Sequence, residues 1–566
     1  MLSPALALGW LPLLAGCRGE PGPGAKYGDT GEGAPDSVAV ADSSDSGGLD
    51  TGDSAADTGP VVDTGDSALD TGEACVPTGE EVCGNGVDDD CDGTRNGCGW
   101  EGAVAIEDAG FAIDYEEEGQ ASSSAVAGNV DVDGDGFVDL LVGASCTGLD
   151  PSVYTCNDGA AGAIYVVRGG AARDLPADLS GAWARVDGVE AAYMLGSALV
   201  SLGDVDGDGL GEFASYTADS PSPPPGGALY VISGVPAGRS EVDDVAIATY
   251  RAEDDGLRID AAAGGGDLDA DGVPDLAMRE GGSGGGAVTW VCAATGRGTV
   301  TSASCGASVG AGEPRSAVGE PVRADADLTG DGIDDLVAVN ADDCRVELGC
   351  TASSMANGAV YVLAGPIDAD VSWADRDAEL VGEGVYDAVG SEGASSVSTI
   401  EDFDGDGGAD VGVLTPYWDP AHDDYEGWGA VYVVTGPIGG SASLGSASTV
   451  FRGPRNFYLG FCLAAQGDLD GDGRSDLAFE GSAADDPGSN AFKVVFGRRD
   501  GAVMDVPDAE FVGAKTESPG SSCGTLGDLD SDGYRDIVAG DVGYDYNADR
   551  YRFYGRTSVI FGREGW

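Results

Sequence analysis

The chain has 566 residues, which allows two or three ordinary domains or one large repeat domain with accessory segments. Its 97 Gly residues are typical of a protein with many turns, and 42% hydrophobic residues are too many for disorder throughout. With 27 Lys and Arg against 100 Asp and Glu, the formal charge of −73 excludes binding to nucleic acid or to an anionic membrane surface, because both need basic patches. A compact fold with this charge repels itself, so we expect bound cations.

The chain begins with an apolar run over residues 1–16, which is too short to span a membrane as a helix. The run ends in Leu14-Ala15-Gly16-Cys17, which resembles the lipobox of bacterial lipoproteins. In that family the signal peptide is cut before the Cys, and the Cys is then acylated. The resemblance implies a protein of the bacterial cell envelope that is anchored by lipid on Cys17 at the outer membrane or cell surface.

Residues 17–74 have no hydrophobic periodicity and are rich in Asp, Thr, Gly and Ser. Asp-Thr-Gly occurs five times, starting at Asp29, Asp50, Asp57, Asp63 and Asp70. This tripeptide is also the signature of aspartic proteases, but there it lies in a loop between apolar strands, which this stretch lacks. The composition predicts a disordered acidic linker that is extended by its own charge.

A small Cys-rich and Asp-rich segment over residues 75–99 follows the linker. It resembles a short metal-binding motif found in many bacterial surface proteins. Asp88, Asp90 and Asp92 alternate before Gly93, so their carboxylates could converge on one further cation. An acidic disulfide knot without metal is the alternative.

The chain contains 13 Cys residues, of which 12 remain when Cys17 is set aside. Most of them are close together in sequence, and this spacing suits disulfides in an oxidising compartment. Free buried thiols are the alternative. The close sets are Cys75, Cys83, Cys91 and Cys98; Cys146 and Cys156; Cys292 and Cys305; and Cys344 and Cys350.

An internal repeat dominates the rest of the chain. The pattern D-x-D-x-D-G-x-x-D occurs seven times, and successive copies start 73, 63, 60, 75, 66 and 60 residues apart. Each unit therefore has the size of a four-stranded propeller blade with its loops. Seven copies at such regular spacing are not explained by polar turns alone.

Each copy offers a set of hard oxygen ligands that suits Ca²⁺ better than a transition metal. The ligands are side chains at positions 1, 3, 5 and 9 and the backbone carbonyl at position 7. In sequence order, the seven sets are Asp131, Asp133, Asp135, Phe137 and Asp139; Asp204, Asp206, Asp208, Leu210 and Glu212; Asp267, Asp269, Asp271, Val273 and Asp275; Asp327, Thr329, Asp331, Ile333 and Asp335; Asp402, Asp404, Asp406, Gly408 and Asp410; Asp468, Asp470, Asp472, Arg474 and Asp476; and Asp528, Asp530, Asp532, Tyr534 and Asp536.

Two copies depart from the pattern, with Glu212 at position 9 and with Thr329 at position 3, where a neutral oxygen is expected to weaken the site. The loop also differs from an EF-hand, because Val142 occupies position 12 and no helices flank it. Instead, an apolar run such as Leu140-Leu141-Val142 follows the loop and predicts a buried strand.

A second element repeats in step with the loops. Gly-bounded runs of apolar and β-branched residues, such as residues 162–167 and 227–232, follow the loops and predict strands. Another short strand is expected upstream of each loop, for example at residues 195–200.

Together these elements resemble the FG-GAP repeat of the integrin α-subunit head, over residues 100–566. The resemblance implies an all-β, seven-bladed β-propeller with four strands per blade. It also implies about seven Ca²⁺ ions in loops on one face, and partner binding mostly on the opposite face.

The two ends of this repeat region are expected to pair. The last strand-like run, residues 558–562, lies four residues from the end of the sequence, so its blade lacks an outer strand. Residues 110–115 form a strand-like run ahead of the first loop that has no blade of its own. We expect this run to be the fourth strand of the last blade, because such closure hides two sheet edges.

The sequence contains no recognisable catalytic motif. The single His, His422, lies among acidic residues, and there is no G-x-S-x-G elbow, H-E-x-x-H pair or phosphate-binding loop. Two functions remain open. One is a surface binding or adhesion module for a protein or glycan; the other is a calcium-dependent polysaccharide lyase or hydrolase.

Overall fold

The chain divides into two units, Met1–Val76 and Pro77–Trp566. The computed structural model describes residues 103–106, 110–117, 120–147, 160–171, 175–189, 194–216, 228–252, 257–281, 287–310, 320–341, 343, 357–384, 387, 389–390, 396–418, 428–453, 459–482, 490–498, 501–504, 507–513, 522–541 and 555–563. Cys17, the linker over residues 17–74, the segment with Asp88, Asp90 and Asp92, and His422 lie outside these residues.

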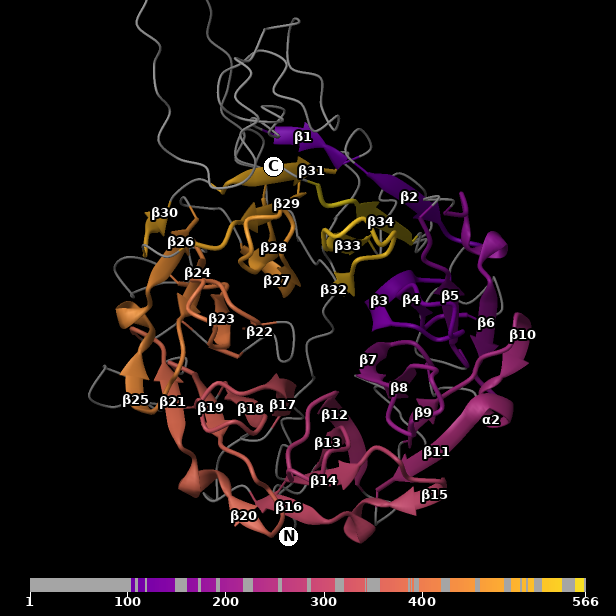
Figure 1. Cartoon of the computed structure of the whole chain (residues 1–566), viewed down its shortest axis with the longest axis horizontal. Coiled ribbons are helices and arrows are strands. Elements are labelled where there is room, and N and C mark those ends of the chain that lie inside the picture. The colour runs from indigo at the N-terminus through magenta and orange to yellow at the C-terminus, as the bar shows by residue number, and fades with distance from the viewer. Residues whose placement is uncertain are drawn as a thin grey trace, which may run out of the picture. The chain divides into compact units, whose positions relative to one another are not determined.

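The described part of the second unit is an all-β, seven-bladed propeller, as the repeat predicts (Figure 1). Its strands form seven separate sheets, and these follow one another around the ring in chain order. The first strands of the blades lie nearest the centre in this view. They are β3 (Ser122–Val130), β7 (Ala198–Gly203), β12 (Arg258–Gly264), β17 (Glu320–Ala326), β22 (Val397–Ile400), β27 (Leu459–Gly467) and β32 (Ser522–Gly527).

Second and third strands carry the apolar runs that the sequence identifies, and most of their residues are buried. The second strands are β4 (Asp139–Ala144), β8 (Glu212–Tyr216), β13 (Asp275–Gly281), β18 (Asp335–Asn340), β23 (Asp410–Thr415), β28 (Asp476–Ser482) and β33 (Asp536–Asp541). The third strands are β5 (Ala163–Val167), β9 (Ala228–Ile232), β14 (Val288–Ala293), β19 (Ala359–Leu363), β24 (Ala430–Val434), β29 (Asn490–Val495) and β34 (Arg556–Ile560).

The fourth strands complete each antiparallel blade. They are β6 (Ala184–Asp187), β11 (Ala246–Arg251), β16 (Ala307–Gly310), β21 (Ala378–Val381), β26 (Thr449–Arg452), β31 (Ala509–Val512) and β2 (Phe111–Asp114). The hydrophobic core lies between adjacent blades. In one cluster, for example, Val337 and Val360 of the fourth blade pack with Val411 of the fifth, and all three are fully buried. Each blade is therefore stabilised by its neighbours, as in other repeat architectures.

Six of the seven sheets have a fifth strand, which differs from the expected four. Each fifth strand pairs in parallel with the fourth strand, and five of them come from the next blade along the chain. These strands are β10 (Gly238–Glu241), β15 (Gly298–Thr301), β20 (Val371–Ser372), β25 (Gly440–Ser443), β30 (Val503–Met504) and β1 (Ala103–Ala105). They cover outer edges that would otherwise expose unpaired backbone groups.

The predicted closure of the ring is confirmed. Strand β2 pairs antiparallel with β34, with Phe111 opposite Val559 and Asp114 opposite Arg556. The expected strand over residues 195–200 is shifted, since β7 begins only at Ala198.

Two disulfides lie among the described residues. Cys292 and Cys305 form the close pair that the spacing predicts, whereas Cys462 and Cys523 join β27 to β32 in adjacent blades. The second pair is 61 residues apart in sequence, so spacing alone could not identify it. Cys146 is also disulfide-bonded, and its partner lies outside the described residues.

Helical segments are short. They are the α-helix α2 (Val242–Val245) and the 3-10 helices η1 (Leu179–Gly181), η2 (Ser302–Ser304), η4 (Trp373–Asp375) and η6 (Leu444–Ser446). Within the described part of the chain, no helix has the length and apolar character needed to cross a membrane.

Candidate metal centres

Each of the seven acidic loops joins the first strand of a blade to the second. Loop 1 runs from Asp131, after β3, to Asp139, the first residue of β4, and the other six take the same place in their blades. Because all seven make the same strand connection, they lie on one face of the propeller, which we call the loop face.

The backbone of all seven loops turns in the same way. The position-6 Gly, such as Gly136, has a φ between 84° and 99° in every loop, a region that side-chain-bearing residues rarely adopt. Position 4 also has a positive φ, even where it is Ala270 (64°) or Ser531 (55°). Such residues are strained there, so the loop geometry is imposed by its surroundings and not by glycine alone.

The carboxylate at position 1 accepts hydrogen bonds from several backbone N–H groups of its own loop. In loop 1, one oxygen of Asp131 accepts the N–H of Gly134 at 2.7 Å and the other accepts the N–H of Gly136 at 2.8 Å. The position-6 N–H makes the equivalent bond in all seven loops, at 2.7–3.0 Å. The position-5 carboxylate likewise accepts the N–H of position 7, at 2.8–3.0 Å.

The acid at position 9 anchors the loop to the blade. It is fully buried or nearly so in every loop, and one of its oxygens accepts the N–H of position 2, at 2.7–3.0 Å. In five loops the other oxygen accepts an N–H from a Gly that follows the third strand, for example Gly436 to Asp410 at 2.8 Å. This acid therefore has a structural role without any metal.

Burial and the neighbouring carboxylates disfavour the charged form of these acids. Burial raises the pKa of Asp139 to about 7, and Asp133 and Asp135 add to the shift. The pKa values of Asp275 and Asp536 are likewise raised to about 7, and those of Asp335 and Asp410 to about 6, with burial as the largest cause. A bound cation would favour the carboxylate forms again.

The donor set fits a hard cation. In five loops, three acidic side chains each offer an oxygen, and these oxygens lie within 4.8 Å of one another. The groups are Asp131, Asp133 and Asp139; Asp204, Asp206 and Asp208; Asp267, Asp269 and Asp271; Asp327, Asp331 and Asp335; and Asp402, Asp404 and Asp410. Carboxylate oxygens on a nine-residue turn match the chemistry of Ca²⁺.

Loop 4 departs from the others at position 3, as its sequence predicts. The hydroxyl of Thr329 donates to Asp335 at 3.3 Å, and its N–H donates to the other oxygen of Asp335 at 2.7 Å. In loop 2, Glu212 replaces Asp at position 9 and still accepts the N–H of Val205 at 2.8 Å.

Charged residues outside the repeat pattern also contact the loops. Arg168, which follows β5, pairs with Asp133 in loop 1. Arg297, between β14 and β15, pairs with Asp206 in loop 2. These residues have no counterpart at the same position of other blades, so no repeat pattern could identify them.

Neighbouring loops are also joined to each other through the backbone. The residue at position 8 donates to the carbonyl of position 1 in the preceding loop: Gly211 to Asp131 at 2.6 Å, Ser475 to Asp402 at 2.8 Å and Arg535 to Asp468 at 2.9 Å. Gly170 of the first blade donates to Leu529 of loop 7 at 2.7 Å, across the point of ring closure. Loops 1 and 2, and loops 5, 6 and 7, are thus linked directly through the backbone, and the first blade is linked to loop 7.

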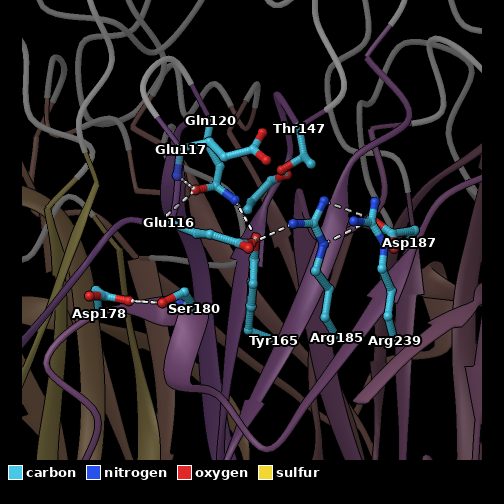
Figure 2. Close-up of polar contacts among 11 residues, drawn as sticks. Glu116, Glu117, Gln120, Thr147, Tyr165, Asp178, Ser180, Arg185, Asp187 and Arg239 are labelled. Carbon is cyan, nitrogen blue, oxygen red and sulfur yellow. Dashed lines mark hydrogen bonds and ion pairs between the residues drawn. The ribbon is translucent and has the colours of Figure 1, made fainter.

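The face opposite the loop face carries buried tyrosine contacts. Tyr165 donates to Glu116 at 2.6 Å and lies beneath Arg185, in a network that includes Gln120 (Figure 2). Glu116 and Gln120 precede β3, at the end of that strand away from loop 1. Burial raises the pKa of Tyr165 far above its ordinary value, and the hydrogen bond to Glu116 adds to the shift. This phenol therefore acts as a hydrogen-bond donor and not as a base.

The same contact recurs in two other blades. Tyr361 donates to Asp343 and Tyr432 donates to Glu383, each at 2.7 Å. Burial also raises the pKa of Tyr361, to about 12. These tyrosines fix segments that connect strands on the face opposite the loops.

The chain matches no protein-family model and has no significant match among curated proteins.

Proposed function

We propose that the chain is a calcium-binding β-propeller of the FG-GAP, integrin-α-like type, in which each of the seven loops holds one Ca²⁺. The observation that carries this proposal is the repetition of one loop geometry, with carboxylates of positions 1, 3, 5 and 9 gathered around the same turn in successive blades. Seven divalent cations on one face would offset much of the local negative charge. They would thereby hold together a rim that otherwise repels itself.

In each loop, the side chains at positions 1, 3, 5 and 9 would hold the ion, and the position-9 acid would also fix the turn beneath it. The carbonyl at position 7, for example that of Phe137 in loop 1, is a further proposed ligand. Asp88, Asp90 and Asp92 would form one more site in the Cys-rich segment.

We further propose that the propeller is a cell-surface binding or adhesion module whose partner is a protein or a glycan. Support comes from the tyrosine contacts, since Tyr165, Tyr361 and Tyr432 brace the connecting segments of the face opposite the loops. A lipid on Cys17, followed by the acidic linker over residues 17–74, would hold this module at the bacterial outer membrane or cell surface.

The experiment is a binding screen of the full chain against glycan and protein arrays, once with millimolar Ca²⁺ and once with EGTA. The proposal expects binding to a defined glycan or protein that is lost in EGTA. In parallel, the chain is incubated with a panel of polysaccharides. New reducing or unsaturated ends, formed only with Ca²⁺ present, would identify a lyase or hydrolase instead of a binding module.

A further inference from the structure

Two of the seven loops are paired with an arginine from outside the repeat. Arg168 contacts Asp133 at position 3 of loop 1, lies 4.0 Å from Asp135, and stacks over Trp183 at 4.9 Å. This leaves the Asp133 side chain only 3% exposed. Arg297 contacts Asp206, the position-3 acid of loop 2, whose side chain is 11% exposed. In both loops a guanidinium thus neutralises a proposed calcium ligand.

Loop 6 has a similar pair made from its own residues. Arg474 at position 7 contacts Asp472 at position 5, and both side chains are about a third exposed. Asp472 is more open to solvent than Asp133 and Asp206, so we expect this pair to be weaker.

Loop 3 has the opposite surroundings, because carboxylates of the next blade approach it. The N–H of Asp267 donates to Asp334 at 2.9 Å. Ile367 donates its backbone N–H to Leu268 at 2.7 Å, which brings the following residue, Asp368, close to the loop.

From these contacts we propose that charged residues other than the loop's own ligands grade the calcium affinity of the loops, so that loop 3 fills at the lowest calcium concentration and loops 1 and 2 at the highest. This inference rests on the proposed calcium function. Arg168 and Arg297 are affinity-lowering residues, since a Ca²⁺ ion that enters their loops meets a cation already on the position-3 carboxylate. Asp334 and Asp368 are affinity-raising residues, since they add negative charge beside loop 3.

The expected differences follow from the exposure of these groups. These ion pairs are partly exposed and therefore modest in strength, and a divalent ion doubles the Coulomb energy felt by a nearby charge. Removing one such group should therefore change the calcium affinity of its loop by about three- to tenfold. Loops that lack the group should be unaffected.

The test is hydrogen–deuterium exchange, read by mass spectrometry, on the full chain over a series of free Ca²⁺ concentrations. Peptides that cover each loop give a separate midpoint for the gain of protection. Wild type is compared with Arg297→Gln, Arg168→Gln and Asp368→Asn. Arg239→Gln is the matched control, because Arg239 is also exposed and ion-paired, but to Asp187, which belongs to no loop.

We expect loop 3 to be protected first in the wild-type protein. Arg297→Gln should lower the midpoint of loop 2 by about three- to tenfold, Asp368→Asn should raise that of loop 3 by a similar factor, and the control should change neither. Arg297→Lys, which keeps the charge, should restore a midpoint close to that of wild type.

Two failures are distinguishable. If all loops have the same midpoint and the variants do not change it, the grading is overturned and the calcium proposal stands. Protection of no loop at any calcium concentration would overturn the calcium proposal, and the grading with it.

Discussion

Nε of Arg556 lies 2.8 Å from Oδ1 of Asp114, although the two residues are 442 positions apart in the sequence. The pair joins β34 to β2, the strand that completes the last blade with residues from the start of the propeller. A hydrogen bond between the hydroxyl groups of Ser123 and Thr557, at 2.7 Å, adds a second contact between the same two ends. The closure therefore combines a strand pair with polar side-chain contacts.

Deleting residues 101–116 should destabilise the whole ring. The deletion removes β1 and β2, so it uncovers the outer edges of β31 and β34, and it removes the buried side chain of Ile113, which is 1% exposed. We expect a lower melting temperature and a tendency to associate, measured by thermal unfolding and by size-exclusion chromatography with light scattering.

A matched deletion of residues 29–72, within the acidic linker, should leave the melting temperature unchanged. If the 101–116 deletion melts like wild type and stays monomeric, the pairs that β1 and β2 form do not stabilise the ring.

The fold was largely predictable, because each blade has two recognisable features in the sequence. The acidic loops mark the turn between the first and second strands, and the Gly-bounded apolar runs mark the third strands. The pairing of β2 with β34 also follows from counting strands. The strand-like run at residues 110–115 belongs to no other blade, and the last blade lacks a fourth strand. The fifth strands were not predictable, because pieces such as Val371–Ser372 are too short for any periodicity.

For the candidate sites, the sequence predicts which residues of one loop lie together, but not which residues of other blades contact that loop. Spacing identifies Asp131 and Asp139 as members of one loop, and both lie in one group of oxygens. It cannot identify Arg297 beside Asp206, because that contact comes from another blade and depends on the packing of the ring.

Two aspartates of loop 5 should respond differently to substitution in the absence of metal. Asp410 is fully buried and accepts the N–H groups of Phe403 and Gly436 at 2.7 and 2.8 Å. Asp410→Ala leaves both donors without a partner and should cost about 2–5 kcal/mol of unfolding free energy in EGTA. Asp406 is exposed, so Asp406→Ala should cost less than about 1 kcal/mol under the same conditions.

Urea titrations of both variants, with and without Ca²⁺, measure this difference. In Ca²⁺ the cost of Asp406→Ala should rise, because the variant loses a ligand. Equal costs for the two variants in EGTA would contradict the structural role of Asp410.

Removing calcium should destabilise the wild-type protein strongly. If each site has a Kd of about 0.1–1 mM, then about 2 mM Ca²⁺ adds on the order of 0.6–1.8 kcal/mol per site. Seven sites would add roughly 5–12 kcal/mol, which is comparable to the whole stability of a domain. The melting temperature should therefore fall steeply in excess EGTA and recover when Ca²⁺ is restored; an unchanged melting curve would speak against structural calcium.

Cys17 should determine where the protein is found in the cell. Cys17→Ser should move the protein from the membrane fraction to the soluble fraction, or leave its leader uncleaved, because the lipid can no longer be attached. Detergent phase partitioning followed by immunoblotting measures this. Wild-type protein in the aqueous phase would show that no lipid is attached.

The central claim is that the loops hold calcium, and the number of bound ions tests it most directly. Equilibrium dialysis of the full chain against a high-salt buffer with millimolar free Ca²⁺ measures the excess calcium on the protein side, and hence the number of ions bound per molecule. We predict about seven calcium ions per molecule, and an eighth if Asp88, Asp90 and Asp92 also bind one. Asp402→Ala, which removes the position-1 carboxylate of loop 5, should bind one ion fewer. A chain that carries no calcium at millimolar concentration would contradict it.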